Sequence, residues 1–118
     1  MTPEEVVRAH LEAQASLDID QMTAYLTEDA TFMPAIGYPT WSGIEEIREG
    51  IEGFLKVMTK CDIEIMNLSV AGNVVLTERI DRVAINGQAH DARGMGALEV
   101  SGEKITAWRD YFSSGGNE

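Results

Sequence analysis

The chain has 118 residues, of which 44% are hydrophobic and 25% charged, a composition typical of one globular domain with its own core. Its formal net charge of −11 disfavours nucleic acid and anionic membranes as partners. An acidic N-terminus, the lack of a long apolar run and a single cysteine predict a cytoplasmic protein without a signal peptide, a membrane span or an internal disulfide.

The beginning of the chain predicts two helices. Residues Thr2-Pro3-Glu4-Glu5 are typical of a helix start, because Thr2 can cap the helix, Pro3 suits its first turn and Glu5 completes a capping box. Apolar residues then recur at helical spacing as far as Leu17. A break at residues 18–20 precedes a short second helix, which is expected to carry Leu26 on its inner face.

An extended segment, a loop and a third helix are expected next. The extended segment covers residues 31–35, and the Gly, Pro and aromatic residues of 36–42 predict a loop. Ser42 is expected to cap the third helix, with Glu45 at the capping-box position. The apolar face of this helix extends to Met58.

The second half of the chain predicts a sheet, because the hydrophobic period changes from helical to alternating. Four long strands joined by short Gly- or Asn-containing turns are expected, over residues 61–71, 74–85, 88–100 and 104–112. Helices followed by antiparallel strands predict an α+β fold shaped as a cone, in which three N-terminal helices pack on a strongly curved, mostly antiparallel sheet and enclose a pocket. We expect a single domain over residues 1–113 and a flexible tail over 114–118.

Two strands carry ionisable groups that alternate between their faces. In VVLTERIDRV, Arg79 and Asp81 point to one face, and in ITAWRDYF, Trp108 and Asp110 share a face. If these faces meet in a pocket, a carboxylate held beside arginine can act as a base while a second carboxyl acts as an acid. A salt-bridge ladder on an exposed sheet face is the alternative interpretation.

VLTERIDRV and GEKITAWRDYF resemble the limonene-1,2-epoxide hydrolase family, within the nuclear transport factor 2-like fold group that also holds SnoaL-like and ketosteroid isomerase-like proteins. The MTPEEVV and YLTEDATF segments are similar to that group too. The resemblance implies a hydrolase that needs no cofactor or metal and opens a small apolar epoxide with water in one acid–base step. It implies that Asp110 is the base, Asp81 the acid, and Arg79 the group that orders both, beside Trp108.

The chain departs from the family on the first strand. Members usually place a Tyr and an Asn there to hold the water, whereas the matching residues here are Phe32 and Pro34. The base of ketosteroid isomerase-like proteins also matches Pro34, which disfavours that activity. An epoxide-opening cyclase or isomerase, or a non-catalytic ligand-binding or dimerisation module, therefore stays open beside the hydrolase.

Further residues are candidates for binding a substrate or a second subunit. A small apolar molecule is expected to contact aromatic and methionine side chains, namely Phe32, Met33, Trp41, Phe54, Met95 and Trp108. His10 and Tyr38 are candidates to hold water in place of the missing pair. A homodimer is expected through an apolar patch on the outer face of the sheet, formed by Ile63, Ile65, Val83, Ile85 and Tyr111.

Overall fold

Three α-helices and a six-stranded sheet form the described part of the chain, residues 1–113, in a computed structural model. The helices are α1 (Pro3–Ala13), α2 (Ile19–Thr23) and α3 (Ile44–Leu55), and a 3₁₀ turn, η1 (Gln14–Ser16), follows α1. The strands are β1 (Leu26–Met33), β2 (Trp41–Ser42), β3 (Met58–Ala71), β4 (Val74–Ile85), β5 (Gln88–Ser101) and β6 (Lys104–Tyr111). The flexible tail predicted for residues 114–118 lies outside the described residues.

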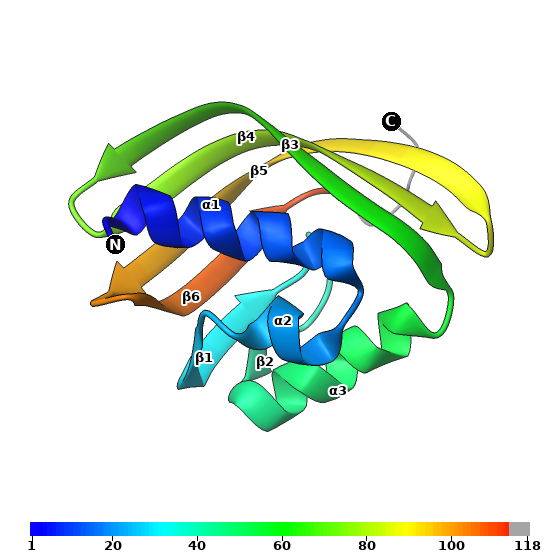
Figure 1. Ribbon diagram of the computed structural model, residues 1–118, viewed down its shortest axis with the longest axis horizontal. Helices are drawn as coiled ribbons and strands as arrows, with labels where there is room; N and C mark the ends of the chain where they lie inside the picture. The colour runs from blue at the N-terminus through cyan, green and yellow to red at the C-terminus, as the bar shows by residue number, and fades with distance from the viewer. Residues whose placement is uncertain (114–118) are drawn as a thin grey trace.

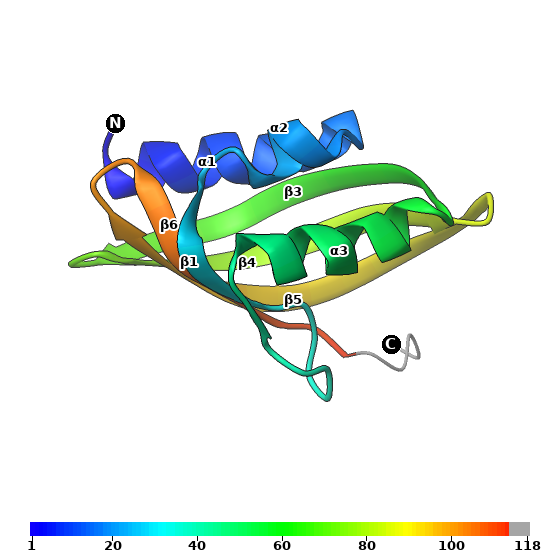
Figure 2. The same ribbon diagram turned by 90° about the horizontal axis from the view of Figure 1, so that it is seen from below.

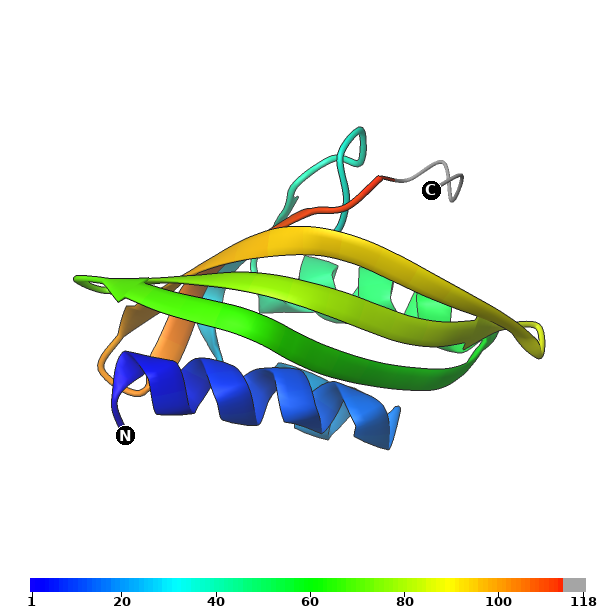
Figure 3. The ribbon, with the colours of Figure 1, turned by 90° about the horizontal axis from the view of Figure 1, so that it is seen from above.

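The sheet has the strand order β2-β1-β6-β5-β4-β3. Neighbouring strands pair antiparallel except β1 and β6, which run parallel. The long strands β3, β4 and β5 arch over the helices (Figures 1 and 2). The view from above in Figure 3 shows these strands in front of α3, with α1 alongside β3. The predicted α+β class, with helices on one side of a curved and mostly antiparallel sheet, is confirmed. No helix in residues 1–113 has the length and apolar character needed to cross a membrane.

The first predicted helix cap is confirmed and the second is wrong. Thr2 and Glu5 form the expected capping box at the start of α1. At the start of α3 the cap position is Gly43, with φ of 90°, and no side chain caps the helix. Glu46, rather than Glu45, accepts a hydrogen bond from the backbone N–H of Ser42 at 3.2 Å. The chain enters α3 through a backbone conformation that glycine adopts easily, and this places Gly43 rather than Ser42 at the cap position.

Two strands begin earlier than predicted. Leu26 starts β1 instead of ending the second helix, because it pairs with Ile105 of β6. Met58 starts β3 instead of extending α3, because it pairs with Ile85 across the β3–β4 hairpin. In both cases a pairing between distant residues outweighs the local helical pattern. The two-residue strand β2, which pairs with β1, has no counterpart in the prediction.

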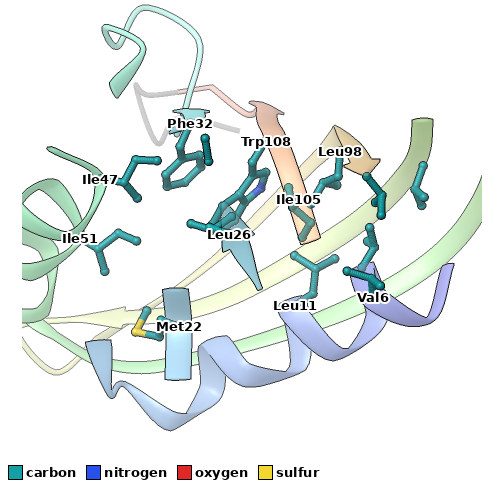
Figure 4. Packing of buried hydrophobic residues seen from close by; sticks show 14 residues of the cluster. Val6, Leu11, Met22, Leu26, Phe32, Ile47, Ile51, Leu98, Ile105 and Trp108 are labelled. Atoms are coloured by element: carbon teal, nitrogen blue, oxygen red, sulfur yellow. The ribbon is translucent and has the colours of Figure 1, made fainter. Parts of the chain in front are cut away.

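The hydrophobic core lies between the helices and the concave face of the sheet. Val6 and Leu11 of α1 pack with Leu98 and Ile105 at one end, as Figure 4 shows. Met22, Ile47 and Ile51 belong to the same core toward α2 and α3. The helices therefore close one end of the curved sheet with tight packing, and the other end is left for a cavity.

The apolar patch predicted on the outer face is wrong for four of its five residues. Ile63 lies opposite Asp81 and Ile65 opposite Arg79 in the β3–β4 pairing, so both share the concave face with those charged residues. Val83 and Ile85 line the cavity described below. Only Tyr111 points outward, with 47% of its surface exposed. The homodimer itself stays a prediction.

The packing of Trp41 on α3 gives a test of this fold. A Cβ atom at Gly50 would lie 2.6 Å from the indole ring of Trp41, while a Cβ atom at Gly53 would meet nothing within 4 Å. Gly53→Ala should raise the free energy of unfolding by about 0.5–1 kcal/mol through helix propensity alone. Gly50→Ala should lower it by about 1–3 kcal/mol, because the indole must move.

The two variants are compared by urea unfolding, with tryptophan fluorescence as the probe. Gly53→Ala serves as the matched control, since both glycines lie in the same helix. Equal stabilisation in both variants would contradict the placement of Trp41 against α3.

Candidate active site

Arg79 joins two carboxylates from different strands on the concave face of the sheet. It donates through Nε to Asp81 Oδ1 at 3.2 Å and through Nη2 to Asp81 Oδ2 at 2.8 Å. It also donates through Nη1 to Asp110 Oδ1 and through Nη2 to Asp110 Oδ2, both at 3.0 Å. The guanidinium plane therefore binds both carboxylates in the paired geometry that gives arginine its strongest contacts.

This cluster is removed from bulk water. Arg79 is only 1% exposed and Asp110 only 5%, while the side chain of Asp81 keeps 17% of its surface accessible. The guanidinium carbon of Arg79 also lies 4.8 Å from the centre of the Phe112 ring, within range of a cation–π contact. The salt-bridge ladder on an exposed sheet face, the alternative drawn from the sequence, is excluded by this burial.

The surroundings of Asp110 suit a base. Burial raises the pKa of its carboxyl group, while Arg79 and the Trp108 indole, which donates to Oδ1 at 2.9 Å, act in the opposite direction. Three N–H donors aim at the carboxylate and favour its ionised form, and a raised pKa makes that form a stronger proton acceptor. Both aspartates raise the pKa of Arg79 despite its burial, so the guanidinium stays charged.

A cavity of about 250 Å³ opens beside the three charged side chains. Most of its wall is apolar and includes Phe54, Leu55, Met58, Ile63, Val83 and Ile85. Its polar groups come mainly from the cluster, with Gln14, Tyr38 and Cys61 as additions. An apolar cavity with a few converging polar groups has the character of a small-molecule site.

An aromatic wall separates the cluster from α1. Phe32 stacks on Trp108 with 3.8 Å between ring centres and 12° between ring planes, and the two residues are partners in the parallel pairing of β1 and β6. His10 meets Trp108 edge-on at 4.4 Å. Its imidazole is completely buried, and neither ring nitrogen has a hydrogen-bond partner among residues 1–113. Burial, with the positive charge of Arg79 adding to it, lowers the pKa of His10 to about 3.

Some of the residues predicted to bind substrate line the cavity, and others do not. Phe32, Tyr38, Phe54 and Trp108 line it, and Tyr38 is 40% exposed. His10 is not among the lining residues, but its ring contacts Trp108, which is.

Three of the predicted binding residues lie elsewhere. Met95 pairs with Glu78 and points to the convex face, where it is 50% exposed. Met33 pairs with Arg109, whose place on β6 alternates with that of Trp108, so Met33 also faces away from the cavity. Trp41 packs behind the cavity wall, with its ring 5.6 Å from Phe32 and 6.0 Å from Phe54. A place in substrate binding is therefore wrong for Met33 and Met95, and Trp41 supports the wall from outside.

Two further residues of the cavity wall carry polar groups, Gln14 and Cys61. Gln14 donates its amide N–H groups to the backbone carbonyls of His10 at 2.8 Å and Met22 at 3.1 Å, which leaves its oxygen as an acceptor. Burial, strengthened by the negative charge of Asp81, raises the pKa of the Cys61 thiol to about 12. The thiol stays protonated at neutral pH and is a poor nucleophile. Within residues 1–113 no group of His, Cys, Asp and Glu side chains is arranged to hold a metal ion.

Comparison with known proteins connects this geometry to a chemical activity. Residues 1–115 match the limonene-1,2-epoxide hydrolase catalytic domain. The chain is 30% identical over 112 residues to epoxide hydrolase EphG of Mycobacterium tuberculosis, a match that spans 90% of this chain and 70% of the relative.

Solved structures also resemble this chain in fold. The structure of an M. tuberculosis epoxide hydrolase of this type superimposes with a TM-score of 0.82 at 27% identity, covering 94% of this chain and 82% of the other. SalBIII, an epoxide hydrolase/cyclase-like enzyme in pyran ring formation in the polyether salinomycin, matches with a TM-score of 0.84. That match is 19% identical and covers 96% of this chain and 92% of the other, so it bears on the fold alone.

The buried imidazole of His10 predicts how stability depends on pH. Its pKa falls from an ordinary 6.5 to about 3 on folding, so below pH 6.5 the unfolded chain takes up a proton that the folded chain refuses. The stability contributed by His10 is therefore complete above pH 6.5 and is lost progressively as the pH falls toward 3. Between pH 6.5 and 4.5 the loss amounts to about 2 kcal/mol.

The prediction is tested with His10→Phe, which keeps an aromatic ring against Trp108 and cannot titrate. The difference in unfolding free energy between this variant and the wild type should change by about 2 kcal/mol from pH 6.5 to 4.5, in favour of the variant at low pH. His90→Gln, at an exposed position of β5, is the control and should follow the wild type. A constant difference between His10→Phe and wild type would contradict the burial of a neutral imidazole.

Proposed function

The chain belongs to the limonene-1,2-epoxide hydrolase family, and we propose that it opens a small apolar epoxide with water in one acid–base step. The observation that carries the proposal is the buried cluster in which Arg79 holds Asp81 and Asp110 at the wall of an apolar cavity. The chain is thus a hydrolase of the epoxide hydrolase type, and the substrate and mechanism are the parts proposed.

In the proposed reaction Asp110 is the base and Asp81 the acid. Asp110 takes a proton from water, and the water oxygen forms a bond to one epoxide carbon. The bond between that carbon and the epoxide oxygen breaks, and the oxygen receives a proton from Asp81. The product is a diol, and the proton gained by Asp110 returns to Asp81 through solvent, which reaches the partly exposed Asp81 side chain.

Hydrogen bonding at Asp110 indicates which oxygen contacts the water. Among residues 1–113, Oδ1 accepts from Arg79 Nη1 and from the Trp108 indole, whereas Oδ2 accepts from Arg79 Nη2 alone. A carboxylate oxygen offers about two acceptor sites, so Oδ2 keeps one for the incoming water. We therefore assign Oδ2 as the atom that takes the proton.

The cavity favours a small substrate. Its volume of about 250 Å³ lies below the range of about 300–1,000 Å³ that is usual for ligand cavities. Apolar side chains of β3 and β4, including Ile63 and Val83, face a hydrocarbon skeleton, and the charged cluster faces the epoxide oxygen.

A homodimer in the cytoplasm stays a prediction from the sequence.

The proposal is tested with three carboxylate variants and a panel of small epoxides such as limonene 1,2-epoxide, cyclohexene oxide and styrene oxide. Asp110→Asn and Asp81→Asn should each lower kcat for diol formation by at least about 100-fold, because each removes one partner of the proton transfer. Asp91→Asn, at an exposed position of β5, is the matched control and should keep wild-type kcat. Wild-type turnover by Asp110→Asn would refute the mechanism.

A cyclase is the second candidate function, and the wall beside the base favours it. Phe32 and Pro34 line the cavity at the positions where family members usually hold water, and neither side chain offers a hydrogen bond. A nucleophilic hydroxyl carried by the substrate needs less help from the protein than a free water, because the substrate already fixes its position.

An epoxide with a hydroxyl group four or five carbons away separates the two functions. A cyclase should convert it mainly to a ring ether, whereas a hydrolase should give the triol, and water labelled with oxygen-18 marks only the triol. Phe32→Tyr adds a hydroxyl beside Trp108 and should raise the share of the hydrolysis product. An excess of triol from the wild type would exclude the cyclase.

A further inference from the structure

The ion pair between Arg79 and Asp110 crosses strand β5, and the residues of β5 that lie beneath this pair are glycines. Arg79 lies on β4 and Asp110 on β6, and β5 runs between these two strands. Their backbones are therefore about 10 Å apart, twice the spacing of neighbouring strands. The Arg79–Asp110 contact has to pass over β5 on the concave face.

Register places glycine at both crossing points. Gly94 pairs with Arg79, and Gly96 pairs with Thr77 on one side and with Asp110 on the other. Met95 between them points to the opposite face. On the concave face β5 therefore presents bare backbone over two successive inward positions.

A side chain at Gly96 would occupy the space that the ion pair uses. A Cβ atom there would lie 2.6 Å from Arg79 Nη1, 2.8 Å from Asp110 Oδ1 and 3.1 Å from Thr77 Oγ1. The first two distances are shorter than any normal contact of a Cβ atom, and both atoms belong to the same 3.0 Å hydrogen bond. Even one methyl group would therefore push Arg79 Nη1 and Asp110 Oδ1 away from the sheet.

Gly94 affects the guanidinium through Phe112. A Cβ atom at this position would lie 2.6 Å from the Phe112 ring, which can lie this close to β5 only because the side chain is missing. Phe112 in turn supports the guanidinium of Arg79 at 4.8 Å. The two glycines thus set the height of Arg79 above the sheet from two independent contacts.

We propose that Gly96, supported by Gly94, is a positioning residue that fixes Arg79 and Asp110 in the geometry required for catalysis. This inference rests on the proposed function for its effect on turnover, and on the structure alone for its effect on the position of Asp110.

The indole N–H of Trp108 gives a measurement that needs no turnover. It donates to Asp110 Oδ1, the same atom that the added methyl group would approach to 2.8 Å. The chain has two tryptophans, so a proton–nitrogen correlation spectrum shows two indole signals, and Trp41→Phe assigns them. In Gly96→Ala the Trp108 signal should move while the Trp41 signal stays. Gly53→Ala, with open space around it, should leave the Trp108 signal unchanged.

Turnover and its dependence on pH supply the second measurement. Gly96→Ala should lower kcat at least about tenfold with a smaller change in KM, since the methyl group displaces the reacting groups rather than the apolar wall. A weaker contact with Arg79 should move the acidic limb of the kcat/KM profile to higher pH. The double variant Gly96→Ala/Asp110→Asn should be no slower than Asp110→Asn alone, because both changes disable the same group.

The outcomes separate this proposal from the proposed function. A folded Gly96→Ala with an unchanged Trp108 signal, or with wild-type kcat and pH profile, overturns the positioning role. A wild type that opens no epoxide, together with a displaced Trp108 signal in Gly96→Ala, refutes the proposed substrate and supports the positioning role.

A double-mutant cycle measured by Tm keeps the proposal testable if Gly96→Ala is too unstable for the other measurements. The methyl group should lower Tm less in an Asp110→Ala background, where the carboxylate at 2.8 Å is absent. An equal loss in both backgrounds would show that the methyl group does not act through Asp110 and would overturn the proposal.

Discussion

A buried guanidinium is the constraint around which the rest of this molecule is arranged. Arg79 cannot lose its proton and has almost no contact with water, so its charge must be compensated inside the protein. Two carboxylates and one aromatic face supply that compensation. Removing one carboxylate would leave buried N–H groups of Arg79 without an acceptor, which costs about 1–3 kcal/mol. The same contacts therefore stabilise the fold and define the active site, and a substitution there changes stability and activity together.

The curvature of the sheet makes such a site possible. A flat sheet would expose Arg79 to solvent, whereas the curved strands β3, β4 and β5 enclose their concave face together with the helices (Figures 1 and 2). At one end α1 fills the hollow with apolar side chains such as Leu11. At the other end α3 contributes Phe54 to a cavity wall and leaves space for a ligand. His10 and Trp108 lie where the packed end meets the hollow end, and this explains a histidine with the burial of a core residue.

Alternation along single strands allowed several features to be predicted from the sequence, and pairing between strands decided the others. The faces shared by Arg79 and Asp81 follow from spacing alone. The outward position of Met95 could have been found too, because the two-residue turn between Ile85 and Gln88 fixes the pairing along the whole β4–β5 hairpin. The inward position of Ile63 could not, because the β3–β4 register shifts by one residue between Ile65 and Asn67. Such irregularities leave no reliable mark in a single sequence, and each one reverses the faces beyond it.

A similar register shift, in the β5–β6 pairing, is required for the proposed chemistry, and the burial of the cluster favours a reaction in a single step. Between Glu99 and Val100 the β5–β6 register moves by one residue, and this aligns Asp110 with Gly96 rather than with the outward-facing Met95. Asp110 thereby meets Arg79, whose Nη2 donates to both carboxylates. In the proposed reaction one carboxylate gains a proton as the other loses one, so the total charge of the cluster does not change. Separate steps would create or remove a full charge in a site with little water, which is costly. Because Arg79 Nη2 contacts both carboxylates, the guanidinium can stay in place while the negative charge on Asp110 is replaced by one on Asp81. This arrangement therefore favours a concerted opening of the epoxide.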